Sequence, residues 1–475
     1  MTAIPATRLS PVLVEIPRSA RADMRVPARI YADETLWEAI QGDRTVDQLL
    51  NVATLPGVTG AVYAMPDAHE GYGFPVGGVA AFDAETGIIS PGGVGYDINC
   101  GVRLLRGDIE ADALGARLEP LVHELSRAIP SGMGRGGPLQ LSDAELDRVL
   151  VEGVEYLVER AMATPEDLET IEANGRIPWA SPRDVSTRAR ERGRGQLGTI
   201  GSGNHFLEVQ RVARIIDQDA ATALGLREGQ CTVLIHTGSR GFGHQVCTDF
   251  VRRMDRVMAR HHIHVPDREL ACGPFASDEG QAYFGAMGAA ANFAFANRQV
   301  ITHRVRDVFT RMLGAEGMLT LVYDVAHNMA KAELHEGRRL IVHRKGATRA
   351  FGPSHPETPA RYRAVGQPVL IPGSMGTASY VLVGTDAALT ESFGSCCHGA
   401  GRRMSRGAAK RLQAGHEVRR VLEEKGIVVR CARSQELAEE APEAYKDVER
   451  VVDVVHRAGL ARTVARLEPI GVVKG

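Results

Sequence analysis

Five side chains of the kinds that bind metal ions stand where short apolar segments give way to glycine-rich turns. They comprise one carboxylate, one thiol and three imidazoles: Asp97, Cys100, His205, His236 and His327. A lone free cysteine or histidine is more often a core residue than a ligand. The repeated context, at the ends of expected strands, nevertheless favours a shared site for two metal ions. A thiolate could bridge both ions and leave open positions for catalysis.

The other six cysteines fit structural roles. Cys231 and Cys247 lie in apolar neighbourhoods, and the adjacent Cys396 and Cys397 cannot easily face one ion. An odd count of seven cysteines, scattered over 475 residues, is not a disulfide framework. This usage indicates a reducing, cytosolic environment.

Two glycine-rich loops have the composition of phosphate-binding sites. The loop 372–377 combines glycines with hydroxyl side chains, and such turns point backbone N–H groups at anions. It is not a Walker loop, because no Gly-Lys-Ser/Thr follows. The second loop sets His398 among small residues beside Arg402, where an imidazole could attack phosphorus and an arginine could neutralise the developing charge. The alternative is a surface turn with an incidental histidine.

Three clusters of basic residues lie near these candidate site motifs, although the whole chain is nearly neutral. Lysine and arginine number 56 against 58 acidic residues, a net charge of −2, which excludes a polybasic protein but not a local groove. Charge runs are usually solvated faces. Three runs near the candidate site favour a groove for a phosphate backbone, without base-specific recognition. The residues are Arg183, Arg188, Arg190, Arg192, Arg194, Arg338, Arg339, Arg344, Lys345, Arg349, Arg402, Arg403, Arg406, Lys410, Arg411, Arg419 and Arg420.

Strands must position most of the candidate ligands. Short apolar runs bounded by turn residues predict strands at 58–65, 76–82, 101–107, 205–212, 231–236 and 319–323. Their spacing is too irregular for a simple doubly wound sheet. We therefore predict an α+β fold with mixed sheets, metal ligands at strand ends, and one domain over residues 1–475.

Helices are expected between and after these strands. Helical periodicity over 110–172, with a capping box at Ser142, predicts a helical insertion at about 110–190. An Ala-rich helix is expected at about 279–313, another from about His327, and a basic one at about 402–424.

Composition limits the class of protein. Apolar residues make up 44% and charged residues 24%, which is typical of a globular protein, and aromatic residues at 5% exclude a design built on stacking platforms. No signal peptide is visible in the first 29 residues, and no run approaches the ~20 apolar residues of a membrane span. We expect a soluble, cytoplasmic protein without a membrane partner.

Taken together, the motifs resemble those of the RtcB family of RNA-splicing ligases, from about Val58 to Gly475. Six strings in order carry the resemblance: Met65 to Gly78, Gly95 to Gly101, Gly203 to Glu208, His236 to Arg240, Asp324 to Asn328 and His398 to Arg402. The resemblance implies the family's own α+β fold and a ligase that depends on GTP and Mn²⁺. Such an enzyme joins an RNA 3′-phosphate or 2′,3′-cyclic phosphate to a 5′-hydroxyl, after opening a cyclic phosphate to a 3′-phosphate.

The resemblance also implies roles for single residues. His398 would accept GMP from GTP and pass it to the RNA 3′-phosphate. Asp97, Cys100 and His205 would hold one Mn²⁺, and Cys100, His236 and His327 the other. Arg240 and Arg402 lie inside the motifs and would neutralise transferring phosphates. On ligand softness alone, zinc fits this donor set at least as well as manganese.

Guanine-nucleotide contacts are also implied by the resemblance, along the same motifs and near the C-terminal end. An archease-type activator is a further partner that the family leaves open. The implied nucleotide contacts are Asn204, His205, Phe206, Leu207, Glu208, His327, Asn328, Pro372, Gly373, Ser374, Met375, Ser379, His398, Gly399, Ala400, Gly401, Tyr445 and Lys474.

Two other functions use some of the same residues. A binuclear metallophosphoesterase or nuclease would share the metal cluster and basic groove, but would need neither a histidine in a Gly-Ala-Gly loop nor a second nucleotide-binding loop. A non-catalytic RNA-binding scaffold would show degraded ligand positions, and none is degraded here.

Overall fold

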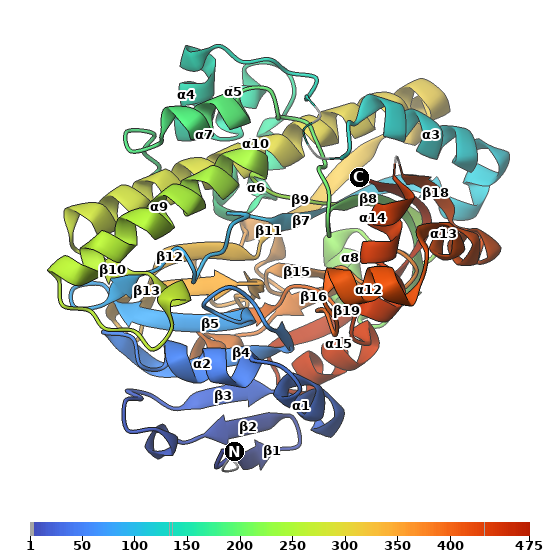
Figure 1. Cartoon of the computed structure of the whole chain (residues 1–475). Helices are drawn as coiled ribbons and strands as arrows, with labels where there is room; N and C mark the ends of the chain where they lie inside the picture. The colour runs from blue at the N-terminus through green and yellow to red at the C-terminus, as the bar shows by residue number, and fades with distance from the viewer. Residues whose placement is uncertain (1–3, 133, 135, 432) are drawn as a thin grey trace.

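Two large, mainly antiparallel sheets form the centre of the computed structural model, which describes residues 4–132, 134, 136–431 and 433–475 (Figure 1). Helices pack around these sheets and fill the long connections between their strands. Parallel pairing occurs between β3 (Ala28–Tyr31) and β4 (Val58–His69), and between β18 (Val428–Cys431) and β19 (Ala461–Lys474). The expected α+β fold with mixed sheets is therefore confirmed.

The first sheet is built largely from the N-terminal part of the chain. Its order is β1-β2-β3-β4-β5-β13-β12, so a hairpin from the middle of the chain extends a sheet that begins at the N-terminus. The remaining strands of this sheet are β1 (Thr7–Ser10), β2 (Leu13–Ile16), β5 (Val76–Asp83), β12 (Asn328–His335) and β13 (Arg338–Lys345).

The second sheet carries most of the candidate metal ligands at its strand ends. Its order is β11-β7-β9-β8-β19-β16-β15, with β18 beside β19. The last long strand of the chain, β19, thus lies between β8 and β16 in the middle of the sheet. The other strands are β7 (Gly101–Glu110), β8 (Phe206–Ile215), β9 (Gln230–Thr237), β11 (Leu319–Ala326), β15 (Pro368–Ile371) and β16 (Ser379–Gly384).

Two long helices, α9 (Arg240–Arg260) and α10 (Asp278–Leu313), pack against each other and run across one side of the molecule (Figure 1). Most of α10 is buried, because its alanines and glycines let other chain segments approach closely. It contacts β9, β12 and the first three of the short α-helices that follow β7. The short helices are α3 (Leu118–Ala128), α4 (Asp143–Glu152), α5 (Glu155–Val158), α6 (Pro165–Glu169) and α7 (Thr187–Gly193).

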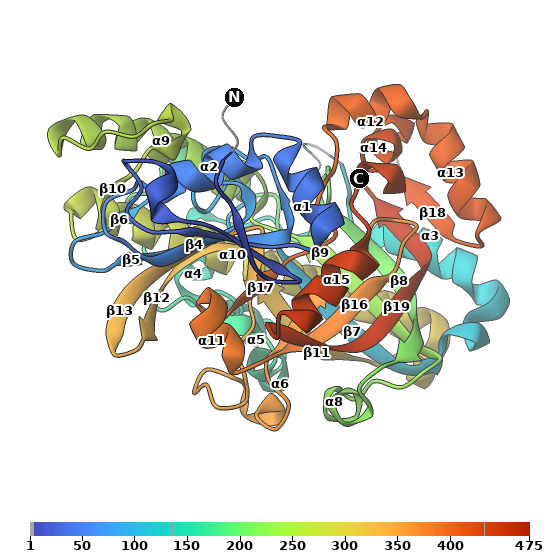
Figure 2. The same cartoon turned by 90° about the horizontal axis from the view of Figure 1, so that it is seen from below.

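The C-terminal helices lie beside the second sheet, and α15 (Val448–Arg457) packs on both β19 and β4 (Figure 2). This helix therefore joins the two sheets. Valines occupy one face of α15 and are buried there. The other helices of this region are α11 (Ala387–Ser392), α12 (Arg406–Leu412), α13 (Gly415–Glu424) and α14 (Ser434–Glu439).

Two sequence expectations about secondary structure were wrong. The segment after His327 is the strand β12, not a helix, since it pairs with β13 through a two-residue turn at Glu336 and Gly337, both with positive φ. Its Ala, Lys, Glu and Leu favour helix, but pairing within the sheet decides the outcome. The basic helix expected over 402–424 is two helices, α12 and α13, separated by an extended break at Gln413 and Ala414.

Candidate metal and nucleotide site

The five candidate metal ligands meet at one end of the second sheet. Cys100 Sγ lies 3.3 Å from His205 Nε2 and 3.4 Å from His236 Nε2. His236 Nε2 in turn lies 3.4 Å from His327 Nε2. Asp97 Oδ2 lies 2.8 Å from His205 Nε2. Two groups of three potential ligands result, one of Asp97, Cys100 and His205 and one of Cys100, His236 and His327, and Cys100 belongs to both.

Strand order explains this convergence. Because β7 lies between β11 and β9, Gly101 is paired with Ala326 on one side and with Thr237 on the other. Cys100, His327 and His236 are the chain neighbours of these three residues. The next pair along, Phe206 with His236, brings in His205. Adjacent strand ends therefore deliver ligands that are far apart in the sequence.

The donor set fits a pair of transition-metal ions. Burial lowers the pKa of His236 and of His327 well below the ordinary value, so both imidazoles are neutral at pH 7 and carry a lone pair. His205 Nδ1 lies 3.1 Å from the Ile200 carbonyl, a contact that directs Nε2 to the cluster. Burial raises the pKa of the Cys100 thiol, and only a cation in place of its proton would make the thiolate favourable there.

A buried aspartate holds the candidate nucleophile. Asp67, at the end of β4, is fully buried, and its Oδ2 accepts hydrogen bonds from His398 Nδ1 at 2.6 Å and from the His398 backbone N–H at 2.9 Å. The Gly399 N–H adds a third contact at 3.2 Å. Burial opposes ionisation of Asp67, but His398 outweighs it and lowers the pKa of the carboxyl. This contact places the imidazole proton on Nδ1, so a neutral His398 carries its lone pair on Nε2.

His398 stands next to the metal cluster, in a cavity. Its ring centroid lies 4.8 Å from that of His327. Four of the five candidate metal ligands, all but His205, also line this cavity. Most of the residues expected to contact the nucleotide line it too: Asn204, Phe206, His327, Asn328, Pro372, Gly373, Ser374, Met375, His398, Gly399, Ala400, Gly401, Tyr445 and Lys474.

The other residues expected to contact the nucleotide lie behind those that line the cavity. Leu207 packs in the main hydrophobic core. Glu208 is buried, and Gln210 Nε2 donates to its Oε2 at 2.8 Å and to Ser379 Oγ at 3.2 Å. Ser379 Oγ accepts from the Gly373 N–H at 3.2 Å, so this chain of contacts supports the loop at 372–377. Burial raises the pKa of Glu208 to about 8.

The two arginines inside the motifs differ in position. Arg402 lines the cavity, where its guanidinium lies 5.0 Å from the centroid of the Tyr445 ring and donates to Glu440 at 2.9 Å. Arg240 lies outside the cavity lining, and its Nη1 is 2.9 Å from His205 Nδ1. Arg402 therefore lies at the cavity, held by Glu440 and Tyr445, whereas Arg240 contacts a candidate metal ligand.

The basic clusters are only partly available to a nucleic acid. Arg344, Lys345 and Arg349 were expected on the surface and are buried. Arg344 pairs with Glu333 through two bonds of 2.6 and 2.9 Å, and Arg349 pairs with Glu172 and Glu357. Arg344 and Arg349 are therefore held by buried ion pairs within the fold and are not available to a nucleic acid.

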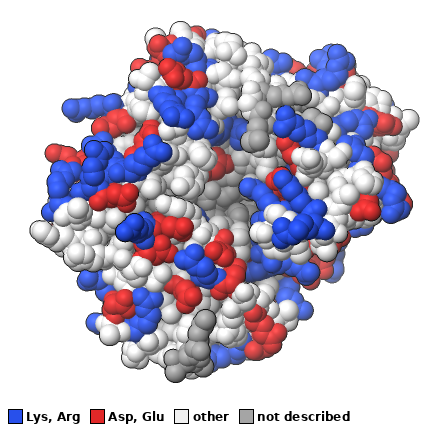
Figure 3. Space-filling model, in the orientation of Figure 1, with Lys and Arg blue, Asp and Glu red and all other residues white. Residues whose placement is uncertain are grey.

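Other arginines of the clusters remain exposed. On the face seen in Figure 3, basic side chains gather on both sides of a central hollow. Arg190 and Arg194 are tied to Asp147 and Asp143 of α4. The exposed members of the three clusters are Arg183, Arg188, Arg192, Arg194, Arg338, Arg339, Arg403, Arg406, Lys410, Arg411 and Arg420.

Sequence reasoning missed several residues of this site. Asp67 had the same signal as the metal ligands, since it follows the apolar run 58–65 directly. Lys345 lines the cavity, where burial lowers its pKa to about 7 and its Nζ donates to the Phe74 carbonyl at 3.0 Å. Arg406 and Glu440 also line it, and Arg406 donates to Glu440 at 3.0 Å. Their pairing depends on tertiary contacts that no local pattern reveals.

Across the described residues, no helix has both the length and the apolar character needed to cross a membrane.

Comparisons with known proteins all match one family. A family model described as tRNA-splicing ligase RtcB matches residues 48–475. The chain is 55% identical over 469 residues to the tRNA-splicing ligase RtcB of Archaeoglobus fulgidus, a match that covers 97% of each protein. It is 53% identical over 479 residues to the protein of the same name from Thermococcus kodakarensis, with 99% of each covered. The RNA-splicing ligase RtcB of Mycobacterium tuberculosis is 53% identical over 435 residues, which are 90% of this chain and 100% of that protein.

Proposed function

The chain belongs to the RtcB family of tRNA-splicing ligases, and we propose that it is a GTP-dependent RNA ligase. It joins an RNA 3′-phosphate or 2′,3′-cyclic phosphate to a 5′-hydroxyl, in tRNA splicing or RNA repair. One observation carries the proposal: His398 is fixed by the buried Asp67, beside a cluster of five metal-type ligands. Neither a phosphoesterase nor an RNA-binding scaffold needs such a histidine.

The first step is transfer of GMP to His398. The His398 Nδ1 proton is engaged by Asp67, so Nε2 carries the lone pair that attacks the α-phosphorus of GTP. The Nε2–P bond forms while the bond between the α-phosphorus and the bridging oxygen breaks, and pyrophosphate leaves. The negative charge of Asp67 stabilises the imidazole as it becomes positive.

Two further displacements complete the ligation. An oxygen of the RNA 3′-phosphate attacks the GMP phosphorus, the Nε2–P bond breaks, and an RNA-3′-pp-G intermediate forms. The 5′-hydroxyl oxygen of the second RNA then attacks the RNA 3′-phosphorus, loses its proton, and displaces GMP. A cyclic phosphate is first hydrolysed to a 3′-phosphate by water. His398 ends in its starting form, ready for another GTP.

We propose two Mn²⁺ ions per active site. Asp97, Cys100 and His205 would hold one, and Cys100, His236 and His327 the other. When bound, the ions supply Lewis-acid stabilisation of phosphoryl oxygens and activation of a water or hydroxyl. The thiolate and imidazole ligands also suit Zn²⁺, so the assay below includes both metals.

We propose that the nucleotide binds in the cavity, in contact with the residues that line it and with those directly behind them. The loop residues Pro372 to Met375 line the cavity, and the Lys474 ammonium, which also lines it, lies 5.6 Å from the centroid of the Phe206 ring. Arg402 and Arg240 would neutralise charge on the transferring phosphates. The other proposed contacts are His205, Leu207 and Glu208, which precede or lie in β8, and Ser379 in β16.

The cysteines support a proposal for the cellular compartment. All seven cysteines are free, and Cys100 must stay reduced to bind metal. We therefore place the enzyme in the cytoplasm. We also propose that residues 1–475 form one ligase domain. An archease-type activator is the protein partner that we propose to test for.

The experiment combines covalent labelling with a ligation assay. The protein is incubated with α-³²P-labelled GTP and Mn²⁺ or Zn²⁺, denatured, and examined for retained label. We expect acid-labile label on the wild type and none on His398→Ala. Ligation is then compared for RNA with 3′-phosphate, cyclic phosphate and 3′-hydroxyl ends, and only the first two should join. Cleavage of RNA without retained GMP would identify a phosphoesterase or nuclease instead.

A further inference from the structure

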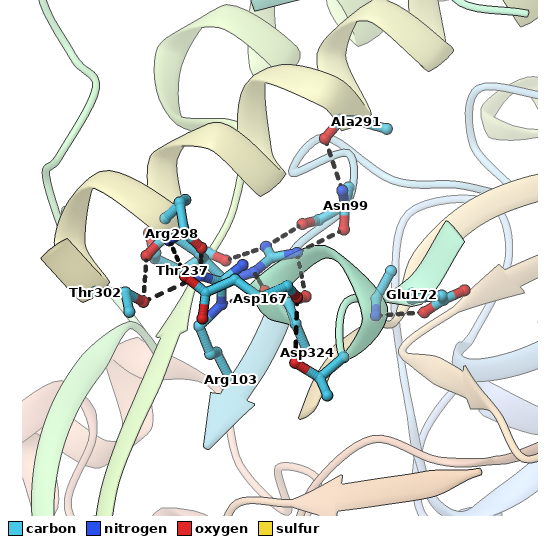
Figure 4. Close-up of polar contacts among 12 residues, drawn as sticks. Asn99, Arg103, Asp167, Glu172, Thr237, Ala291, Arg298, Thr302 and Asp324 are labelled. Carbon is cyan, nitrogen blue, oxygen red and sulfur yellow. Dashed lines mark hydrogen bonds and ion pairs between the residues drawn. The ribbon is translucent and has the colours of Figure 1, made fainter. Parts of the chain in front are cut away.

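A buried arginine lies directly behind the metal cluster, on the long helix α10. The Arg298 side chain is 0% exposed, and its guanidinium points at the ends of the strands that carry the ligands (Figure 4). A guanidinium has five N–H donors. Arg298 uses all five, and each bond ends on one of three chain segments that bear candidate metal ligands.

The bonds of Arg298 connect these three segments to one another. Nη1 donates to the carbonyls of Asn99 and Thr237, both at 2.8 Å. Nη2 donates to Asn99 Oδ1 at 3.0 Å and to Asp324 Oδ1 at 2.9 Å, and Nε donates to Asp324 Oδ2 at 2.8 Å. Asn99 precedes Cys100, Thr237 follows His236, and Asp324 lies three residues before His327 on β11. One side chain thus joins the segments of all three ligands in the second group.

The surrounding backbone is shaped to accept this arginine. Gly101 has no side chain, and a Cβ there would lie 3.0 Å from the guanidinium carbon of Arg298. Asn99 has a φ of 51°, a left-handed conformation that an asparagine tolerates. Its Nδ2 donates to the Ala291 carbonyl of α10 at 2.7 Å, which is a second tie between the same turn and the same helix.

Packing alone does not explain a fully buried cation at this position. Removing an arginine from water is costly, and an apolar side chain of similar volume would stabilise a core at least as well. Arg103 on β7 is equally buried and shares Asp324, to which it donates at 2.7 Å, but it otherwise donates to Gln299 and Thr302. Arg298 differs from Arg103 in that it bonds the turns beside the metal ligands.

The neighbouring residue on α10 holds the remaining ligand segment. Asn297 Oδ1 accepts from the N–H groups of Gly198 and Thr199, in the turn that leads to His205. Its Nδ2 donates to the carbonyls of Thr199 and Gly238, both at 3.1 Å. The segment that carries His205 is therefore tied down by a different side chain, which also bonds Gly238, next to Thr237.

We propose that Arg298, oriented by Asp324, is a positioning residue that sets the spacing of Cys100, His236 and His327 for one of the two metal ions. The proposal rests on the metal site of the proposed function. Loss of the guanidinium should weaken the ion held by these three ligands. The ion held by Asp97, Cys100 and His205 should be affected less, because Asn297 fixes the His205 segment.

The experiment is a metal titration of the whole protein, with Arg298→Lys compared with Arg103→Lys. Stripped proteins are titrated with Mn²⁺ by calorimetry and with Co²⁺ by absorption of the thiolate-to-metal band, and thermal unfolding is recorded without metal. Both variants should lose thermal stability. Only Arg298→Lys should show a rise in the Kd of one ion, of about 10–100-fold, which is the usual cost of losing a side chain that orients metal ligands.

Asn99→Gly keeps the proposal testable if Arg298→Lys fails to fold. Glycine accepts the positive φ but removes both side-chain bonds to α10, so one Kd should rise along with some loss of stability, and Arg103→Lys controls for that loss. Equal Mn²⁺ affinities in the wild type, Arg298→Lys and Asn99→Gly would overturn the proposal. A matching loss in Arg103→Lys would also overturn it, since that outcome would assign the effect to general destabilisation. A wild type that binds no Mn²⁺ or Co²⁺ would instead refute the metal site itself.

Discussion

Asp67 and His398 lie 331 residues apart in the chain and are joined by a hydrogen bond of 2.6 Å from the imidazole Nδ1 to the carboxylate. The carboxylate is fully buried, and it also accepts the backbone N–H groups of His398 and Gly399. The contact therefore fixes both the position of the imidazole and the nitrogen that carries its proton. In the proposed ligase, this arrangement prepares Nε2 for attack on GTP.

We predict that Asp67→Asn slows attachment of GMP to His398 by about 10²–10⁴-fold, because the amide neither stabilises the imidazolium nor specifies the tautomer. The measurement is the single-turnover rate of GMP labelling at saturating GTP. His398→Ala is the control and should give no label while retaining two metal ions. Labelling of Asp67→Asn at the wild-type rate would show that the carboxylate has only a structural role.

Cys100→Ser should lower the content of both metal ions, because Cys100 belongs to both ligand groups. A serine hydroxyl rarely loses its proton and is a poor bridging ligand. Metal content after dialysis against Mn²⁺, measured by atomic emission, tests this. Cys247→Ser is a matched control, since Cys247 is also buried but lies in the core. Two ions per chain and full ligation in Cys100→Ser would contradict the bridging role.

Neutralising Arg188, Arg192 and Arg194 to glutamine should weaken RNA binding but leave GMP labelling intact. These side chains are exposed on or next to α7, outside the nucleotide cavity. In a salt titration, the slope of log K against log salt should become shallower by roughly one for each RNA phosphate that the variant no longer neutralises.

Arg344→Gln provides the contrast. Arg344 is buried against Glu333, so this variant should lose stability and keep the salt slope of the wild type. An unchanged affinity and slope in the Arg188, Arg192 and Arg194 variant would mean that those arginines form a solvated face only.

Acid should destabilise the protein partly through Glu172. Burial opposes ionisation of Glu172, but Lys331 and Arg349 outweigh it and lower the pKa from 4.5 to about 2. A carboxyl with a depressed native pKa contributes stability above pH 4.5 and loses it as the pH falls toward 2. Glu172→Gln should cost about 3–5 kcal/mol at pH 7, because the buried Lys331 loses its carboxylate partner and Arg349 loses one of its two. Its unfolding free energy should also depend less on pH between 5 and 3.

Glu208 provides a control in which the unfolding free energy changes with pH in the opposite direction. Burial raises its pKa from 4.5 to about 8, so the folded protein keeps the proton while the unfolded chain releases it. Its contribution to stability therefore falls as the pH rises from 4.5 to 8. Urea unfolding of Glu208→Gln should show a shallower decline over this range. Identical pH profiles for the wild type and both glutamine variants would contradict these assignments.

The convergence of the candidate metal ligands was predictable because each of these residues has a local signal. Asp97, Cys100, His236 and His327 follow apolar runs or flank glycines, and adjacent strands of one sheet then bring such ends together. Asp67 carried the same signal, but a single aspartate after a strand has no visible partner until the fold places it against His398. Nothing in the local sequence indicates that Arg298 bonds three separate turns.

Other errors had different physical causes. Arg344, Lys345 and Arg349 resemble an exposed basic run in the sequence. In the fold, Arg344 pairs with Glu333 on the neighbouring strand, Arg349 pairs with the distant Glu172, and Lys345 donates to the Phe74 carbonyl. The segment after His327 contains good helix formers, yet pairing with β13 makes it a strand. Patterns within a few residues indicate propensity and burial, and they do not indicate which distant charge will pair with a given side chain.

The central place of β19 in the second sheet has a consequence for synthesis on the ribosome. Strands β8 and β16 flank β19 and are both made long before residue 461 emerges. Until then each has an open edge of unpaired backbone groups, which is a template for misassociation. A nascent or truncated chain that ends before 461 is thus exposed to aggregation, and pairing over such sequence separations is slow. The second sheet therefore becomes complete only when the last strand is inserted.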